Sequence, residues 1–221
     1  MTTLITGANR GIGRALLKRL SEEGADLIAT CRRTPPPDLA SRARWFSLDV
    51  TSPEDQCSLA GALADAGLDL LIVNAGVYLD KGQPLDTGFA KPLWDDTFAV
   101  NVTGAFHTIQ SALPAVRRAK GKIAIIASQM GSSEKAPGGS YVYRASKAAA
   151  INLGRNLATD LRSDGIAVGI YHPGWVRTDM GGGSASISPE ESAAGLVQRF
   201  DELSLATTGA FLTWDGTPHP L

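Results

Sequence analysis

The sequence predicts an α/β fold in which a parallel seven-stranded sheet is flanked by helices. Short apolar runs alternate with amphipathic helical segments along the whole chain, which is the pattern of parallel strands joined by right-handed crossovers. The first apolar run leads directly into a glycine-rich turn and a helical segment. An apolar content of 43% over 221 residues is ample for one ordinary core, so we expect residues 1–221 to form a single domain.

Seven short apolar segments are predicted to be strands, at residues 4–5, 26–31, 45–48, 68–73, 122–127, 167–171 and 210–214. Helices are predicted at residues 14–20, 53–66, 94–118 and 142–163 and from residue 189 onward, with Ser52 and Ser188 as N-caps. Gly104 and Pro114 are expected to interrupt the long helix. The prolines at 35–37 exclude a helix in the second crossover and leave only residues 39–44 for a helical turn.

Bulk composition excludes several classes of function. The net charge is −1 with both signs mixed, so neither nucleic acid nor an anionic membrane surface is expected as a partner. No apolar run approaches the length of a membrane span, and the chain enters a strand without a signal peptide. Cys31 and Cys57 are too few for a disulfide framework, and the histidines lack metal-ligand spacing. We therefore expect a cytoplasmic protein without a bound metal.

A glycine-rich turn joins the first strand to the first helix. Residues 6–13 read Thr-Gly-Ala-Asn-Arg-Gly-Ile-Gly, in which the glycines allow the backbone to approach a pyrophosphate and the helix N-terminus offers free N–H groups. A tight strand-to-helix connection without a ligand explains a lone glycine-rich turn about equally well. The order of strand, glycine turn and helix is that of a doubly wound Rossmann domain that binds a dinucleotide.

A tyrosine and a lysine lie four residues apart in the segment 143–147, Tyr-Arg-Ala-Ser-Lys. The alanine-rich run that follows predicts a helix, on which Tyr143 and Lys147 share one face. A free tyrosine titrates at about pH 10, and a nearby cation is expected to lower the pKa of Tyr143 so that it can donate a proton near neutral pH. An exposed tyrosine and lysine on a helix surface is the alternative interpretation of this spacing alone.

Together, the two motifs resemble those of the short-chain dehydrogenase/reductase family. The chain has further motifs in the family's order, at Asn74–Gly76, Asn101, Ser128 and Pro173–Gly174. The resemblance covers residues 2–215 and implies a Rossmann fold and oxidoreductase activity. Within the family, the segments 138–144 and 172–176 are similar to those of the sniffer and C-factor-like carbonyl reductases.

The resemblance implies roles for four catalytic residues. Tyr143 would give a proton to a substrate carbonyl, and Ser128 would hydrogen-bond the carbonyl oxygen. Lys147 would bind the nicotinamide ribose and lower the pKa of Tyr143. Asn101 would distort its helix locally and hold a water that relays protons towards the lysine.

The sequence does not decide which serine belongs to this catalytic set. Ser128 ends a predicted buried strand, where the family places its serine, but its spacing to Tyr143 is longer than the family's usual one. Ser132 and Ser133, in the Gly/Ser-rich loop that follows, therefore remain rivals.

A nicotinamide cofactor site is implied along the ends of several strands. Asp49 is expected to contact the adenine ring, with a role as a turn or capping residue as the alternative. Thr178 is expected to bind the carboxamide, and Asn74 can brace neighbouring strands. The expected cofactor-binding residues are Thr6, Gly7, Asn9, Arg10, Gly11, Ile12, Gly13, Arg32, Asp49, Val50, Asn74, Ala75, Gly76, Tyr143, Lys147, Pro173, Gly174, Val176 and Thr178.

The end of the second strand predicts NADP(H) rather than NAD(H). Enzymes of this fold that prefer NAD(H) have an acidic residue there, which bonds the ribose 2′-hydroxyl. This chain has Cys31 at that position, and Arg32 and Arg10 supply two guanidinium groups that can converge on a 2′-phosphate. Solvated surface charges are the alternative interpretation of both arginines.

The implied substrates are small aldehydes, ketones or quinones. Met130, Trp175 and Met180 are candidates for an apolar pocket, although core or loop packing explains each about equally well, and residues 181–184 predict a flexible lid. One alternative is a C-factor-like nucleotide-binding signalling protein with little turnover, against which the intact catalytic set argues. Another is a ketoacyl-type reductase, for which the sequence shows no convincing basic patch that would dock an acyl carrier.

A homodimer is a further expectation from the resemblance. Family members often pair the two helices that correspond to residues 95–118 and 142–163 across a two-fold axis. Small residues would allow close approach of the second helix to its partner: Ala145, Ala148, Ala149 and Gly154.

Overall fold

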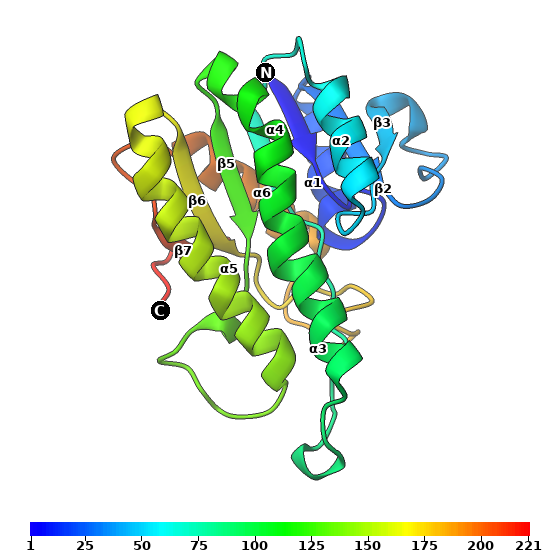
Figure 1. Cartoon of the computed structure of the whole chain (residues 1–221), viewed down its shortest axis with the longest axis vertical. Helices are drawn as coiled ribbons and strands as arrows, with labels where there is room; N and C mark the ends of the chain where they lie inside the picture. Colours follow the sequence, from blue (N-terminus) through cyan, green and yellow to red (C-terminus); the bar gives the residue numbers. More distant parts are fainter.

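Seven parallel strands form one sheet in the computed structural model, in the order β3-β2-β1-β4-β5-β6-β7 (Figure 1). The strands are β1 Thr2–Ile5, β2 Asp26–Cys31, β3 Arg44–Ser47, β4 Leu70–Val73, β5 Lys122–Ile126, β6 Ala167–His172 and β7 Phe211–Thr213. The structure describes residues 1–221, apart from the side chain of Thr87. Because β1 lies between β2 and β4, the winding reverses there, which is where such sheets open a crevice for ligands. The predicted fold class is confirmed.

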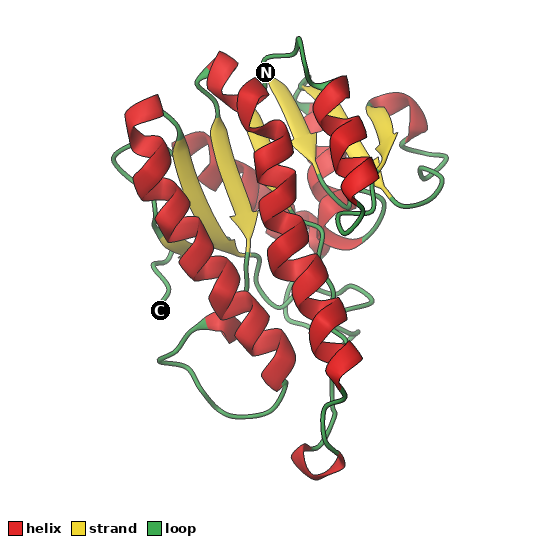
Figure 2. Cartoon of the chain, viewed as in Figure 1, coloured by secondary structure: helices red, strands yellow, loops and turns green.

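Helices cover both faces of the sheet, as Figure 2 shows. The helices are α1 Gly11–Glu22, α2 Pro53–Ala62, α3 Lys91–Phe98, α4 Ala105–Ala119, α5 Tyr141–Asp160 and α6 Pro189–Glu202. Successive strand residues enter different cores: Leu4 packs in the cluster that contains the apolar residues of α2 and α4, whereas Ile5 packs in the cluster that contains those of α1 and α6. Burial on both faces explains why the strands read as continuous apolar runs in the sequence.

The region predicted as one long helix contains a change of helix type. A π-helical segment, Ala99–Gly104, joins α3 to α4, so the predicted interruption at Gly104 is confirmed. A side chain at Gly104 would approach Val50 to 2.8 Å. The predicted break at Pro114 is wrong, because α4 continues through this proline. The proline removes one backbone hydrogen bond, while its neighbours Ala112 and Ala115 are buried against the sheet and hold the helix in place.

The predicted caps and the short crossover are found in the structure. Ser52 Oγ accepts a hydrogen bond from Asp55 N at 3.1 Å. Ser188 and Glu191 form a reciprocal capping box at the start of α6, with N···O distances of 3.1 and 2.7 Å. The crossover between β2 and β3 has a single 3₁₀ turn, Ala40–Arg42, as its prolines predict.

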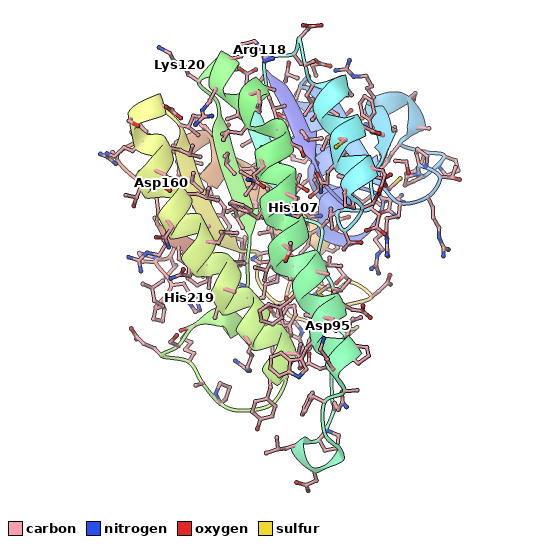
Figure 3. The ribbon with its side chains drawn as sticks, viewed as in Figure 1. Asp95, His107, Arg118, Lys120, Asp160 and His219 are labelled. Carbon is pink, nitrogen blue, oxygen red and sulfur yellow. The ribbon has the colours of Figure 1, made fainter. Side chains whose placement is uncertain are left out.

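The outer surface of α3, α4 and α5 is polar. Asp95, His107, Arg118, Lys120 and Asp160 are exposed along these helices (Figure 3). None of the helices in the described part of the chain is long and apolar enough to cross a membrane.

One of the small residues expected at a dimer surface faces the sheet instead. Gly154 is buried, and a Cβ atom there would lie 2.6 Å from Ile170 of β6. That expectation is therefore wrong for Gly154, because its small size serves the packing of α5 on the sheet. Ala145, Ala148 and Ala149 are half-buried.

Candidate active site

A cleft lies at the carboxyl ends of the strands, on both sides of the point where the winding reverses. Its lining comes from the glycine turn, the residues that follow β2 to β5, the first turns of α5 and the loop after β6. Most of the predicted cofactor-binding residues are in this lining: Gly7, Asn9, Arg10, Gly11, Ile12, Gly13, Arg32, Asp49, Val50, Asn74, Ala75, Gly76, Tyr143, Lys147, Pro173 and Thr178.

Three predicted residues are outside the lining of the cleft: Thr6, Gly174 and Val176. Thr6 is fully buried, and its Oγ1 accepts hydrogen bonds from the backbone N–H groups of Asn74 at 2.9 Å and Ala75 at 3.1 Å. Val176 is also buried, and Gly174 turns the chain with a φ of 87°. These residues shape the cleft rather than line it.

The lining also includes residues that were not among those predicted for the cofactor: Cys31, Leu48, Val77, Val100, Ile126, Ala127, Asp179 and Met180. Ile126 and Ala127 sit at the carboxyl end of β5, so the parallel topology alone could have indicated them. Asp179 and Met180 belong to the loop after β6, and the sequence has no periodic signal that fixes the path of this loop.

The glycine turn brings two backbone segments into close contact. A Cβ atom on Gly13 would lie 2.3 Å from Gly7 O and 2.5 Å from Asn74 Nδ2. Asn74 Nδ2 donates to Thr6 O at 2.9 Å and to Gly7 O at 3.2 Å, so this side chain braces β1 against β4 as predicted. The N-cap residue of α1, Arg10, makes no side-chain capping bond. The first-turn amides of α1 therefore lack a side-chain acceptor at the N-cap, which suits a bound anion.

Tyr143 and Lys147 line the cleft, and Ser128 lies next to Tyr143 but outside the lining. Lys147 Nζ is 5.8 Å from the centroid of the Tyr143 ring, as their spacing on one helix predicts. The side chain of Ser128, which follows β5, lies beside the phenol of Tyr143 and favours its ionised form. The rival Ser132 accepts a hydrogen bond from Lys135 N at 3.2 Å, and Ser133 is exposed. The structure thus places Ser128 against the tyrosine.

Burial changes the proton affinities of both titratable groups. The pKa of Tyr143 is raised to about 12, mainly because burial disfavours the phenolate; the neighbouring Ser128 opposes this change, while Tyr78 and Asp80 reinforce it. Burial lowers the pKa of Lys147 to about 8. The expected decrease in the pKa of Tyr143 is therefore wrong for the protein alone, because desolvation outweighs the nearby amine. Lys147 Nζ donates a hydrogen bond to Ile126 O at 3.0 Å.

Asn101 lies within the π-helical segment, so the predicted local distortion at this residue is confirmed. Its side chain exchanges two hydrogen bonds with the backbone of Val77, at 2.8 and 2.9 Å. Nδ2 also donates to Ser146 Oγ of α5 at 3.0 Å. Asn101 therefore joins three segments around the site, and its role in a water relay stays a prediction.

The end of β2 has the arrangement that the sequence predicted. Cys31 is the last residue of the strand and is buried, and its Sγ donates to Arg33 O at 2.7 Å. Asp49 accepts hydrogen bonds from the N–H and hydroxyl groups of Thr51, which hold the pKa of its carboxyl group below the ordinary value, with a smaller contribution from the charge of Arg32. Asp49 thus lines the cleft and also forms a local turn.

Arg10 is paired with the loop that follows β6. Arg10 Nη1 lies 3.4 Å from Asp179 Oδ2, and both side chains are mostly exposed. Arg10 is therefore a mostly solvated charge with one ionic partner in the loop after β6, and its role as a phosphate ligand stays a prediction.

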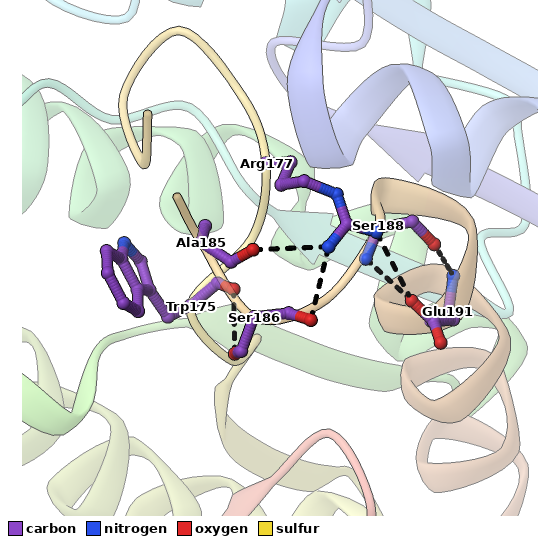
Figure 4. Close-up of polar contacts among 6 residues, drawn as sticks. All are labelled: Trp175, Arg177, Ala185, Ser186, Ser188 and Glu191. Atoms are coloured by element: carbon purple, nitrogen blue, oxygen red, sulfur yellow. Dashed lines mark hydrogen bonds and ion pairs between the residues drawn. The ribbon is translucent and has the colours of Figure 1, made fainter. Parts of the chain in front are cut away.

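The loop from residue 177 to residue 188 is closed at its base by one arginine (Figure 4). Arg177 Nη1 donates to the carbonyl oxygens of Ala185 and Ser186 at 3.1 and 3.2 Å, and Nη2 lies 3.8 Å from Glu191 Oε2. The two ends of the loop also pair through Arg177 N and Ile187 O at 2.9 Å. The base of the predicted lid is therefore fixed.

The tip of this loop is held against the loop that follows β4. Lys81 Nζ donates to Met180 O at 2.9 Å, and Trp175 Nε1 donates to Gly181 O at 3.0 Å. Of the three residues considered for an apolar pocket, Met180 lines the cleft, whereas Met130 and Trp175 are outside its lining. Trp175 is 50% exposed.

In the part of the chain that the structure describes, no three His, Cys, Asp or Glu side chains are grouped so that they could hold a metal ion.

Known proteins resemble this chain along its whole length. The sequence model of the short chain dehydrogenase family matches residues 1–187. The 1-hydroxy-2-glutathionyl-2-methyl-3-butene dehydrogenase of Rhodococcus sp. strain AD45 is 36% identical, over 98% of this chain and 97% of the relative.

Two solved structures have the same fold. The carbonyl reductase Sniffer of D. melanogaster superimposes with a TM-score of 0.93 at 30% identity, covering 100% of this chain and 99% of that one. The NADPH-bound carbonyl reductase from chicken fatty liver superimposes with a TM-score of 0.91 at 30% identity, covering 100% and 98%. The chain belongs to the short-chain dehydrogenase family of oxidoreductases, and its neighbours agree with the sniffer-like branch that the sequence indicated.

Proposed function

We propose that this protein is an NADP(H)-dependent carbonyl reductase in which Tyr143 is the proton donor. The observation that carries the proposal is that Tyr143, with Ser128 beside it, and Lys147 lie in the same cleft as the glycine turn. A proton donor and a dinucleotide site in one cleft are what hydride transfer to a carbonyl requires.

The residues of the cleft fit a phosphorylated dinucleotide. Gly13 permits a backbone approach that a Cβ atom would block, and the N-terminus of α1 offers amides to a pyrophosphate. At the end of β2, Cys31 leaves no carboxylate to repel a 2′-phosphate, and Arg32 and Arg10 both line the cleft. The chicken carbonyl reductase, which has the same fold, was solved with NADPH. When bound, NADPH supplies the hydride.

The protonation state of Tyr143 favours reduction. With a pKa of about 12, the phenol keeps its proton at neutral pH and can give it to the oxygen of a carbonyl as that oxygen gains negative charge. Ser128 donates a second hydrogen bond to the same oxygen, and the ammonium form of Lys147 stabilises the phenolate that results. Oxidation of an alcohol would require the phenolate at the outset, which burial opposes.

The substrate class proposed is small aldehydes, ketones or quinones. Met180 contributes an apolar side chain to the cleft, and the carbonyl reductases among the solved neighbours support this class. The identity of 36% with a dehydrogenase of a glutathionyl alcohol supports a second candidate, a carbonyl compound that carries a glutathionyl group.

A screen with purified protein tests the function. Each carbonyl compound, with and without a glutathionyl group, is mixed with NADPH, and the loss of NADPH absorbance is followed. Tyr143→Phe should reduce kcat about 10²- to 10⁴-fold, as expected for loss of general acid catalysis, while NADPH affinity stays nearly constant. Tyr141→Phe is the matched control, because this tyrosine is on the same helix but outside the cleft lining. A Tyr143→Phe enzyme with normal kcat would exclude this residue as the acid.

We further propose that the protein acts as a homodimer through α4 and α5. The two helices lie on the same face of the sheet (Figure 1), and Ala148 and Ala149 of α5 are half-buried small residues that would permit close contact.

A further inference from the structure

The helix that carries Tyr143 has no capping side chain of its own. Its N-cap residue, Ser140, adopts a left-handed conformation with a φ of 51° and makes no side-chain capping bond. Asp80, from the loop after β4, takes this place. Its Oδ2 accepts a hydrogen bond from Val142 N at 2.8 Å, and both carboxylate oxygens lie within 3.4 Å of Tyr143 N.

Asp80 is an acidic residue that is fully buried without an ion-pair partner in the described part of the chain. Its side chain is 0% exposed, and none of the ion pairs among the described residues includes it. Burying an ionised carboxylate without a compensating partner is costly, so the amides and the partial positive charge at the start of α5 must compensate it. A neutral Ser or Asn at the N-cap position would cap the helix without this cost.

The same loop also contacts the ring of Tyr143. Tyr78 stacks on Tyr143, with ring centroids 4.3 Å apart and planes inclined by 22°. The hydroxyl of Tyr78 is hydrogen-bonded to Ser140 Oγ, and Asn101 holds the backbone of Val77 at the start of the loop. Residues 77–80 therefore fix the backbone and the ring of Tyr143 together.

We propose that Asp80 is a positioning residue for the reaction, which caps α5 and fixes Tyr143 at the start of this helix. This inference rests on the proposed role of Tyr143 as the proton donor. Four groups act on the phenol: Lys147 from α5, Ser128 from the end of β5, Tyr78 from the loop and, through its charge at the start of α5, Asp80. Lys147 favours the phenolate, whereas the negative charge of Asp80 opposes it and raises the pKa of Tyr143.

Two substitutions separate the cap from the charge. Asp80→Asn keeps an oxygen that can accept from the amides but removes the charge, whereas Asp80→Ala removes both. Asp86→Asn is the matched control, because Asp86 is an exposed acid on the same loop. Hydrogen exchange of the Val142 and Tyr143 amides reports the cap without any substrate. The pH dependence of kcat for alcohol oxidation, a direction that needs the phenolate, reports the charge.

In Asp80→Ala, exchange of the two amides should accelerate about fivefold, as expected for a lost cap, and kcat should fall. In Asp80→Asn, protection should persist, while the rise of kcat with pH that marks formation of the phenolate moves about one unit towards acid, because a nearby negative charge has been removed. Asp86→Asn should change neither quantity.

Unchanged amide exchange in Asp80→Ala would overturn the positioning role. A pH profile of Asp80→Asn equal to that of the wild type would overturn the role of the charge. A wild-type protein that reduces no carbonyl compound would refute the proposed function instead, and the exchange experiment would still decide whether Asp80 fixes Tyr143.

Discussion

Replacing Arg32 with alanine should weaken the binding of NADPH but not that of NADH. Arg32 lines the cleft beside Cys31, where a guanidinium can meet the 2′-phosphate. A hydrogen bond to a charged group contributes about 1.5–3 kcal/mol, so its loss should weaken NADPH binding about ten- to a hundredfold. NADH, which lacks the phosphate, should bind as before. Wild-type protein should accordingly have the higher kcat/KM with NADPH.

Arg10→Ala should have a smaller effect than Arg32→Ala, because Arg10 must give up Asp179 to reach the phosphate. The Arg10 and Asp179 side chains are 59% and 83% exposed, and the atoms are 3.4 Å apart, so this pair contributes only about 0.5 kcal/mol. Asp179→Asn should therefore tighten NADPH binding about twofold and leave NADH unaffected.

The assay compares kcat/KM and the dissociation constants of both cofactors for wild type and each variant. Arg33→Ala is the control, since Arg33 is exposed next to Arg32 but outside the cleft lining. Wild-type preference for NADH would refute the reasoning, as would equal losses of both cofactors in Arg10→Ala and Arg32→Ala.

Three further predictions concern packing, pH and assembly. Gly13→Ala should weaken cofactor binding more than tenfold and destabilise the fold by about 1–3 kcal/mol, because its Cβ would lie 2.3 Å from a backbone oxygen. Gly183→Ala, with open space around it, should change neither quantity. Fluorescence titration measures the binding and calorimetry the stability. Burial lowers the pKa of His172 to about 4, so this residue takes up a proton below about pH 6.5 in the unfolded chain but not in the native state. The free energy of unfolding, measured with urea, should therefore fall by about 2 kcal/mol between pH 7 and pH 5 because of this group, and this loss should be absent in His172→Gln. Light scattering should show a dimer, and a single species of 23.1 kDa at micromolar concentration would exclude the proposed assembly.

The fold could be predicted from the sequence because its signals are local and mutually consistent. The apolar runs that became β2 and β6 are buried on both faces, and residues 26–31 were assigned with the observed bounds. The helix break predicted at Pro114 is wrong because helix propensity counts only the local destabilisation by a proline. It does not include the stabilisation from burying the neighbouring residues against the sheet.

The candidate site could be predicted only in part. The helical spacing of Tyr143 and Lys147 was enough to place them together, but the direction of the pKa change was not predictable, because it depends on how completely the surroundings bury the phenol. The contribution of Asp80 had no sequence signal, since a cap supplied by a loop 62 residues away follows no local pattern.

The geometry around Asn101 depends on the number of residues in the π-helical segment. A π turn contains one more residue than the α-helical turn it replaces. Deleting one residue from Ala99–Gly104 would allow a continuous α-helix to form, with α3 and α4 in nearly the same relative phase but without the wider turn that contains Asn101. The turn of Asn101 towards Val77 and Ser146 would then be lost even if the asparagine itself were kept. This stretch should therefore tolerate substitutions on its exposed side far better than any insertion or deletion.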